Sequence, residues 1–215
     1  MSSTTTMIYN SRKNLLDVLS NLGYNTEEYM SFSTNEVEAM IQNDQLDMLI
    51  EYLTDIVPET SYQKTKVYVK YMLNAKAIRL KTAIEEIIEE LYDLEEVLAK
   101  NDTLIVVVND EPNDTMVEKL KFWHDSRGIH VVIHNIKRLQ YNILKHSLVP
   151  KHEILTETQT AELIKKYNLK SAKQLPEISR FDPVSLMICM RPGQVCKIYR
   201  KSQTSVVSDY YRVCV

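Results

Sequence analysis

The last third of the chain opens with the sequence LVPKHEILT at residues 148–156, and this stretch sets how the residues after it fold. Thr156 precedes an amphipathic segment, and Gln159 follows it three residues later. A threonine and a glutamine at this spacing form a capping box, in which each side chain accepts a hydrogen bond from a backbone N–H group at the helix start. The pattern predicts a helix from Thr156 to about Tyr167, with Leu163 facing inward.

Four shorter motifs follow in a fixed order. We expect Asp182 to cap a short helical turn, because Pro183 stands at the first helical position, where proline is favoured. The residues at 195–200 and 210–215 are expected to be strands, which makes this part a small mixed α+β domain. The motifs are QLP at 174–176, DPV at 182–184, RPGQV at 191–195 and YR at 211–212.

The centre of the chain has the pattern of an α/β layer. The uninterrupted apolar run at residues 104–108 predicts a central strand covered on both faces. Asn113 or Asp114 can cap a helix that ends near Gly128, and the next strand is expected at 129–133. Strand, helix and strand at this spacing predict a βαβ unit with two parallel neighbouring strands.

The other expected elements come from periodicity. Helices are expected at residues 10–22, 35–41 and 82–100, the second capped by Ser33 or Thr34 and the third burying a stripe that includes Leu94. A strand at 67–71 is expected to turn at Asn74-Ala75 into a short partner strand at 77–80. Residues 47–53 fit either a helix or a buried strand.

The composition bounds the class of protein. Of the residues, 44% are hydrophobic and 26% are charged, as in an ordinary globular chain. No run approaches the ~18 apolar residues of a membrane span, and the polar start lacks the features of a signal peptide, so we expect an intracellular protein. Cys189, Cys196 and Cys214 show neither a disulfide framework nor zinc-ligand spacing and are expected in the core or in strands.

Charge is divided unevenly along the chain. Residues 1–147 hold 15 lysines and arginines against 23 carboxylates, whereas residues 148–215 hold 11 against 6. The two parts are therefore expected to meet different surroundings, and a nucleic-acid grip along the whole surface is not expected.

No pattern of residues predicts catalysis, a cofactor or a metal site. His130 and His134 are four apart on an expected strand, which places them ~13 Å from each other, too far to share an ion. The chain has no GxSxG motif and no glycine-rich phosphate loop.

In order and spacing, the motifs from residue 148 onward resemble the assembly domain of the fifth, jaw-forming subunit common to eukaryotic DNA-directed RNA polymerases. The C-terminal part of that protein is similar to a small subunit of archaeal RNA polymerase. The resemblance covers residues 146–215 and is weaker over 1–145. It implies an α+β protein with an N-terminal α/β jaw domain at 1–145, a small mixed sheet of restriction-endonuclease-like topology, and an assembly domain at 146–215. It also favours a strand at 47–53.

The resemblance implies a non-catalytic subunit that docks on the largest polymerase subunit, contacts other polymerase subunits and is not a homo-oligomer. By analogy it would act in the nucleus, or in the transcription compartment of a large DNA virus. This chain departs from the family at Pro192 and at Val206-Val207, which leaves the last hairpin open. The interface residues carried over are Leu148, Val149, Pro150, His152, Pro176, Asp182, Pro183, Gly193, Gln194, Arg200, Ser202, Thr204, Tyr211 and Arg212.

The resemblance also implies that the jaw domain lies beside downstream duplex DNA, with weak and non-specific contact. The family's DNA-proximal loop is matched by the segment just after the expected central strand. A second candidate is the basic stretch from Lys64 to Lys81, for which a lysine-protected sheet edge is the alternative. The candidate residues are Pro112, Asn113, Asp114, Thr115, Lys66 and Lys70.

Two alternative functions remain open. A free-standing, degenerate nuclease is suggested by the α/β layer, but no Asp or Glu is followed two positions later by Lys, as those active sites require. A scaffold protein outside polymerase is the other.

Overall fold

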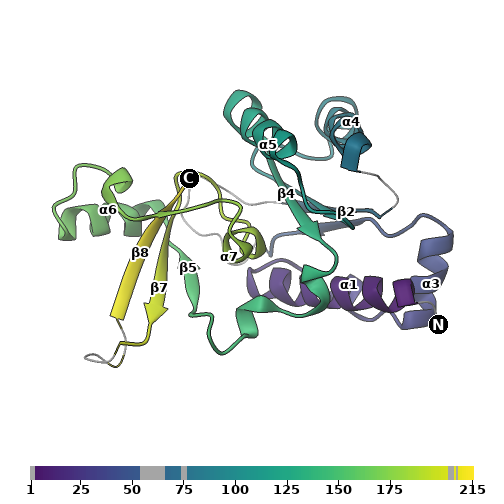
Figure 1. Cartoon of the computed structure of the whole chain (residues 1–215), viewed down its shortest axis with the longest axis horizontal. Helices are drawn as coiled ribbons and strands as arrows, with labels where there is room; N and C mark the ends of the chain where they lie inside the picture. Colours follow the sequence, from purple (N-terminus) through teal and green to yellow (C-terminus); the bar gives the residue numbers. More distant parts are fainter. Residues whose placement is uncertain (1–2, 54–65, 74–76, 203–205, 207) are drawn as a thin grey trace. The chain divides into compact units, whose positions relative to one another are not determined.

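The computed structural model describes residues 3–53, 66–73, 77–202, 206 and 208–215 of the 215-residue chain (Figure 1). Helices and mixed sheets occur together, so the expected α+β class is confirmed. The chain divides into two compact units, the first ending at Tyr141 and the second beginning at Asn142. The predicted domain boundary after residue 145 stays a prediction. Among the described helices, none is long and apolar enough to cross a membrane.

The first unit is built on a four-stranded sheet. Its order is β1-β2-β3-β4, with β1 antiparallel to β2 and the other three strands parallel. All six residues of β3 are buried, as expected for a central strand, and the predicted βαβ unit is confirmed by α5 between β3 and β4. Within residues 47–53, which fitted either a helix or a strand, Met48–Glu51 form a strand. The strands are β1 (Met48–Glu51), β2 (Lys66–Met72), β3 (Thr103–Val108) and β4 (His130–Asn135).

Helices cover both faces of this sheet, with α4 and α5 on one side and α1 and α3 on the other (Figure 1). Of the two candidates for each cap, Ser33 caps α3 and Asn113 caps α5. Ser33 also forms a capping box with Glu36, which the sequence analysis did not predict. The helix expected from residue 10 begins at Ser3, because Thr5 and Ile8 are also buried. The helices are α1 (Ser3–Asn21), α2 (Glu27–Met30), α3 (Thr34–Gln42), α4 (Ala77–Ile88), η1 (Glu89–Leu94), α5 (Asp114–Arg127) and η2 (Arg138–Gln140).

Two sequence expectations in this unit are wrong. The expected strand at 77–80 is the first turn of α4, and the expected turn at Asn74-Ala75 lies outside the described residues. The helix expected to reach Lys100 instead passes into the π-helix η1, where the Glu95 N–H donates to the Glu90 carbonyl at 2.8 Å. This wider turn rotates the following side chains, so Leu94 is 80% exposed rather than in the core.

The second unit contains a mixed sheet of order β5-β7-β8-β6, in which only β6 and β8 are parallel. Thr156 and Gln159 form the predicted capping box of α6, and Asp182 caps α7 with Pro183 in its first turn. The sequence did not predict β5 and β6 as strands. The elements are η3 (Ile143–Lys145), β5 (His152–Ile154), α6 (Glu157–Lys166), η4 (Ala172–Gln174), β6 (Glu177–Ile178), α7 (Pro183–Met187), β7 (Val195–Arg200) and β8 (Ser208–Cys214).

The last two strands form an antiparallel pair that extends to Arg200 opposite Ser208. The connection between them includes Val206, which is 90% exposed, whereas Val207 lies outside the described residues. The departure from the family at this point therefore does not prevent the two strands from pairing.

A small hydrophobic cluster packs α6 against the sheet of the second unit. Leu163 of α6 packs on Val195 and Val213, with Leu175 beside them. The three cysteines are buried, as expected for core residues, and form no disulfide. Burial raises the pKa of the Cys214 thiol to about 11, so this group stays protonated and unreactive near neutral pH.

Candidate subunit interface

Strand alternation divides the side chains of the second sheet between two faces. One face carries Val195, Lys197 and Tyr199 of β7. The opposite face carries Cys196, Ile198 and Arg200. From the pairing register, His152, Tyr210 and Arg212 lie on the Arg200 face. Three predicted interface residues, His152, Arg200 and Arg212, are therefore brought to one face, and Tyr211 lies on the other.

Several predicted interface residues are used within the unit itself. The Nδ1 atom of His152 lies 2.7 Å from the Pro150 carbonyl, and the Asp182 carboxylate accepts the Val184 N–H at 2.9 Å. The Gln194 side chain accepts the Arg191 N–H at 2.8 Å. Gly193 has a φ of +86°, which glycine adopts without strain. These motif residues therefore build the fold of the unit.

Arg212 also has an internal role. Its Nη1 atom donates to the Glu177 carbonyl at 3.0 Å, and its guanidinium lies 5.4 Å from the centre of the Tyr210 ring. The Pro176 carbonyl accepts the Val213 N–H and the Ile178 carbonyl accepts the Val215 N–H, just after β8. The carbonyl of Glu177 between them therefore points away from β8. Arg212 therefore closes part of the outer edge of β6.

Other predicted interface residues are at least partly exposed. Leu148 is 84% exposed, and Pro176, Pro183 and Arg200 are exposed. Among the described residues, none makes a hydrogen bond or ion pair with the Arg200 guanidinium. Val149, Pro150, Ser202 and Tyr211 are half-buried, and Thr204 lies outside the described residues.

A polar network on the other face was not predicted from the sequence. Lys197 pairs with Asp209 at 2.9 Å, and the Tyr199 hydroxyl donates to Glu153 at 2.7 Å. These hydrogen bonds raise the pKa of both Lys197 and Tyr199. The ammonium groups of Lys151 and Lys197 lie over the Tyr199 ring. The signal in the sequence was that Lys197 and Tyr199 on one strand, and Asp209 and Tyr211 on the next, are each two residues apart and so share a face.

The candidate DNA-proximal loop is the start of α5. The Asn113 side chain accepts the Met116 N–H and the Thr115 hydroxyl, both at 2.9 Å. Asp114 and Thr115 are exposed, and Pro112 is half-buried. The nearby Glu111 carboxylate pairs with Arg138 at 2.9 Å, which offsets the negative charge that would repel a phosphate.

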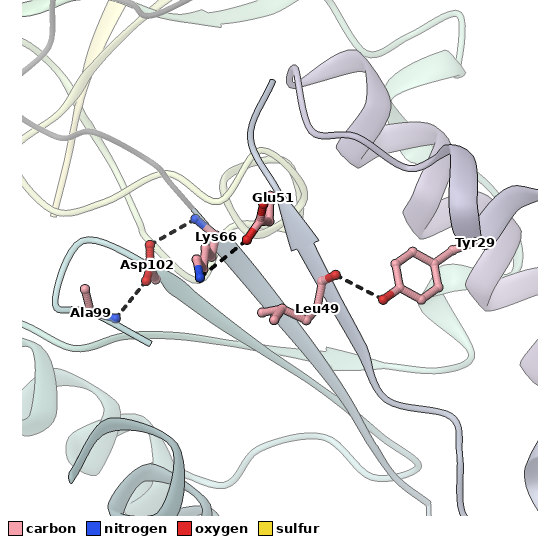
Figure 2. Close-up of polar contacts among 6 residues, drawn as sticks. All are labelled: Tyr29, Leu49, Glu51, Lys66, Ala99 and Asp102. Atoms are coloured by element: carbon pink, nitrogen blue, oxygen red, sulfur yellow. Dashed lines mark hydrogen bonds and ion pairs between the residues drawn. The ribbon is translucent and has the colours of Figure 1, made fainter. Parts of the chain in front are cut away.

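Lys66 and Lys70, the other DNA-proximal candidates, lie on β2. Figure 2 shows the Lys66 N–H donating to Asp102 at 2.9 Å and its ammonium 3.4 Å from Glu51. Asp102 also accepts the Ala99 N–H at 2.7 Å, so it joins β2 to the segment before β3.

The Lys70 ammonium pairs with Asp47 at 2.8 Å. Because β2 pairs with β1 on one side and β3 on the other, it is an inner strand, and the lysine-protected sheet edge is wrong. No contact among the described residues joins Lys66 or Lys70 to the start of α5. Of the other members of the stretch, Lys64, Lys76 and the Arg79 side chain lie outside the described part, and Lys81 is half-buried.

The two histidines considered as metal ligands are buried on β4. Burial, and to a lesser degree Arg138, lowers the pKa of His134 to about 4. Within the described ranges there is no group of three or more His, Cys, Asp or Glu side chains that could hold a metal ion.

Comparison with known proteins identifies the second unit. Residues 141–214 match the family described as RNA polymerase Rpb5, C-terminal domain. DNA-directed RNA polymerase subunit Rpo5 of Pyrococcus abyssi is 45% identical over 76 residues, which are 35% of this chain and 92% of the relative. Rpo5 of Staphylothermus marinus is 46% identical over 80 residues, 37% of this chain and 87% of the relative.

A longer relative shares the same region. DNA-directed RNA polymerases I, II, and III subunit RPABC1 of Caenorhabditis elegans is 44% identical over 77 residues, which are 36% of each chain. The similarity to the Rpo5 proteins covers nearly their whole length, so the chain belongs to the RNA polymerase Rpb5 family.

Proposed function

We propose that this chain is a non-catalytic subunit of a multisubunit DNA-dependent RNA polymerase and that it docks on the largest subunit through residues 146–215. The match of this region to nearly the whole length of the Rpo5 proteins carries the proposal. A polymerase subunit as short as those relatives has little besides this unit with which to hold its complex. The compartment would be that of the polymerase, the nucleus or a viral transcription compartment.

The geometry supports a docking role for the second unit. Arg200 and Leu148 are exposed, and Arg200 pairs with none of the described side chains. Glu153 of β5 and Asp209 of β8 lie on the opposite face and are paired there. The exposed Arg200 guanidinium and the exposed Leu148 side chain fit a partner surface that offers carboxylates and an apolar pocket.

In the same proposal, the first unit flanks downstream DNA. The start of α5 supports this role, because the Glu111 charge is offset by Arg138 and backbone N–H groups at a helix start favour a phosphate. Lys66 and Lys70 give weaker support than the sequence suggested, because each is paired with a carboxylate. No observation favours the nuclease or the scaffold alternative.

Co-purification from the native source tests the proposal. A tagged full-length chain is expected to recover the largest polymerase subunit, and so is a tagged fragment of residues 146–215. The matched control is a tagged fragment of residues 1–141, which should recover none. Recovery of no polymerase subunit by the full-length chain would reject the proposal, and binding by the full-length chain alone would reject the division of roles between the units.

A further inference from the structure

The backbone of β5 presents hydrogen-bonding groups along its outer edge. The Tyr199 N–H donates to the Lys151 carbonyl at 3.0 Å, and the Leu155 N–H donates to the Val195 carbonyl at 2.9 Å. In an antiparallel pair, residues alternate between those bonded to the neighbouring strand and those facing away from it. Lys151, Glu153 and Leu155 therefore face β7, and the backbone groups of His152 and Ile154 face outward.

These outward groups have no partner within the described part of the chain. No hydrogen bond there reaches the backbone N–H or C=O of His152 or Ile154. Two donors and two acceptors alternate at the spacing with which one β-strand recognises another. The edge is short, because Pro150 has no N–H group and the Thr156 N–H already donates to Gln159 at 3.0 Å.

The opposite edge of the same sheet, formed by β6, is partly occupied by a side chain of the same unit. There the outward carbonyl of Glu177 is occupied by Arg212 at 3.0 Å. Proteins usually protect sheet edges against unwanted pairing. The second unit closes part of one edge with its own side chain and leaves the other able to bond.

We propose that the β5 edge, at His152 and Ile154, binds a short extended segment of a polymerase partner as an added β-strand. This inference rests on the proposed docking of the second unit. The added strand pairs over about three residues, the length of β5. Beside His152 and Ile154 the partner presents apolar side chains, and beside Lys151 and Glu153 it presents polar ones, so its sequence alternates.

Hydrogen–deuterium exchange tests the edge without any substitution. The full-length chain is compared free and within affinity-purified polymerase, and exchange is followed at the His152 and Ile154 amides. We expect these two amides to exchange at least about tenfold more slowly in the polymerase, from the ~1.4 kcal/mol of one net hydrogen bond. The Leu155 amide is the internal control, because it is bonded to Val195 in the free chain. Equal exchange of His152 and Ile154 in both states would overturn the proposal.

A proline substitution tests the same edge through binding. Ile154→Pro removes an N–H that bonds to no described residue, and proline is tolerated on an edge strand when its position faces outward. Ile154→Ala is the matched control, because it also shortens the side chain but keeps the N–H group. We expect the proline variant to be retained by polymerase at least about tenfold more weakly than the alanine variant.

The outcomes separate this inference from the proposed function. Retention of both variants alike, with unprotected amides in the wild-type complex, rejects strand addition and leaves docking intact. A wild-type chain that recovers no polymerase subunit rejects both. If Ile154→Pro melts well below Ile154→Ala, the exchange comparison on the wild-type chain decides the question.

Discussion

At the scale of single residues, glycine is required at Gly23 for two reasons. Its φ is +94°, and a Cβ atom there would lie 2.9 Å from the Tyr52 hydroxyl oxygen. Tyr52 packs edge-on against the buried Tyr24 ring, so it cannot easily move away. The sequence shows a glycine after a helical stripe, but it cannot show the tyrosine following β1 that approaches it.

We expect Gly23→Ala to destabilise the first unit by about 2–3 kcal/mol, the cost of a strained backbone plus the contact with Tyr52. Gly128→Ala is the control, because φ is +73° there but nothing lies within 4 Å of the added Cβ, so about 1 kcal/mol is expected. Urea unfolding followed by fluorescence of Trp123, the single tryptophan, measures both variants in the same unit. Equal losses for the two variants would show that Tyr52 moves freely.

A second residue-scale prediction concerns His134. Its pKa in the folded state is about 4, below its ordinary value of 6.5, so the unfolded chain binds a proton that the folded chain excludes. The contribution of neutral His134 to the free energy of unfolding is therefore full above pH 6.5. It falls by roughly 3 kcal/mol as the pH drops toward 4. The His134→Asn variant should lose this part of the pH dependence. Unfolding curves at several pH values, compared between the variant and the wild-type chain, check the prediction.

At the scale of elements, the sequence predicted the helix caps from neighbouring residues, but it did not predict the short strands or the π-helix. The capping box at Thr156 and the cap at Asp182 were predicted outright, and the caps at Ser33 and Asn113 were each predicted as one of two neighbouring residues. Each depends on residues three or fewer positions apart. The two- and three-residue strands β6 and β5 exist because longer strands lie beside them, which no local pattern records. The π-helix likewise required a backbone shift that apolar spacing does not encode.

The cap of α5 gives an element-scale prediction. Asn113→Ala removes the acceptor for the Met116 N–H and the Thr115 hydroxyl and is expected to destabilise the first unit by about 1 kcal/mol. Asn113→Asp keeps an acceptor oxygen and should stay within a few tenths of a kcal/mol of the wild-type chain. Trp123, on the same helix, reports unfolding by its fluorescence. A full loss in the aspartate variant as well would show that the amide nitrogen matters.

At the scale of the whole molecule, the charge asymmetry of the chain was predictable, but the pairing of its charges was not. The basic stretch around β2 looked available in the sequence, whereas Lys66 and Lys70 lie beside Glu51 and Asp47. The interface residues were carried over from a family resemblance. The structure shows that His152, Asp182, Gln194 and Arg212 also hold the unit together, a role that motif spacing cannot distinguish from contact with a partner.

DNA retention by assembled polymerase tests the contribution of the first unit. We expect Lys66→Gln together with Lys70→Gln to change retention only slightly, because both ammonium groups are already neutralised by carboxylates. Each phosphate contact that is lost would lower the salt slope of binding by about 0.9. The retention of DNA by the polymerase is measured across a salt series. Lys137→Gln is the control, because Lys137 is an exposed lysine of the same unit. If the salt slope of the double variant is lower by about 0.9 or more, these lysines do contact DNA.

The bond from Arg212 to the Glu177 carbonyl has a consequence for stoichiometry. A sheet with two open edges can pair at both, so its copies can join end to end into a chain of indefinite length. Because Arg212 of the same unit occupies the outward Glu177 carbonyl, a second copy cannot use that carbonyl to pair with the β6 edge. A unit built in this way offers an open edge at β5 alone, so its copies cannot join end to end through both edges of the sheet.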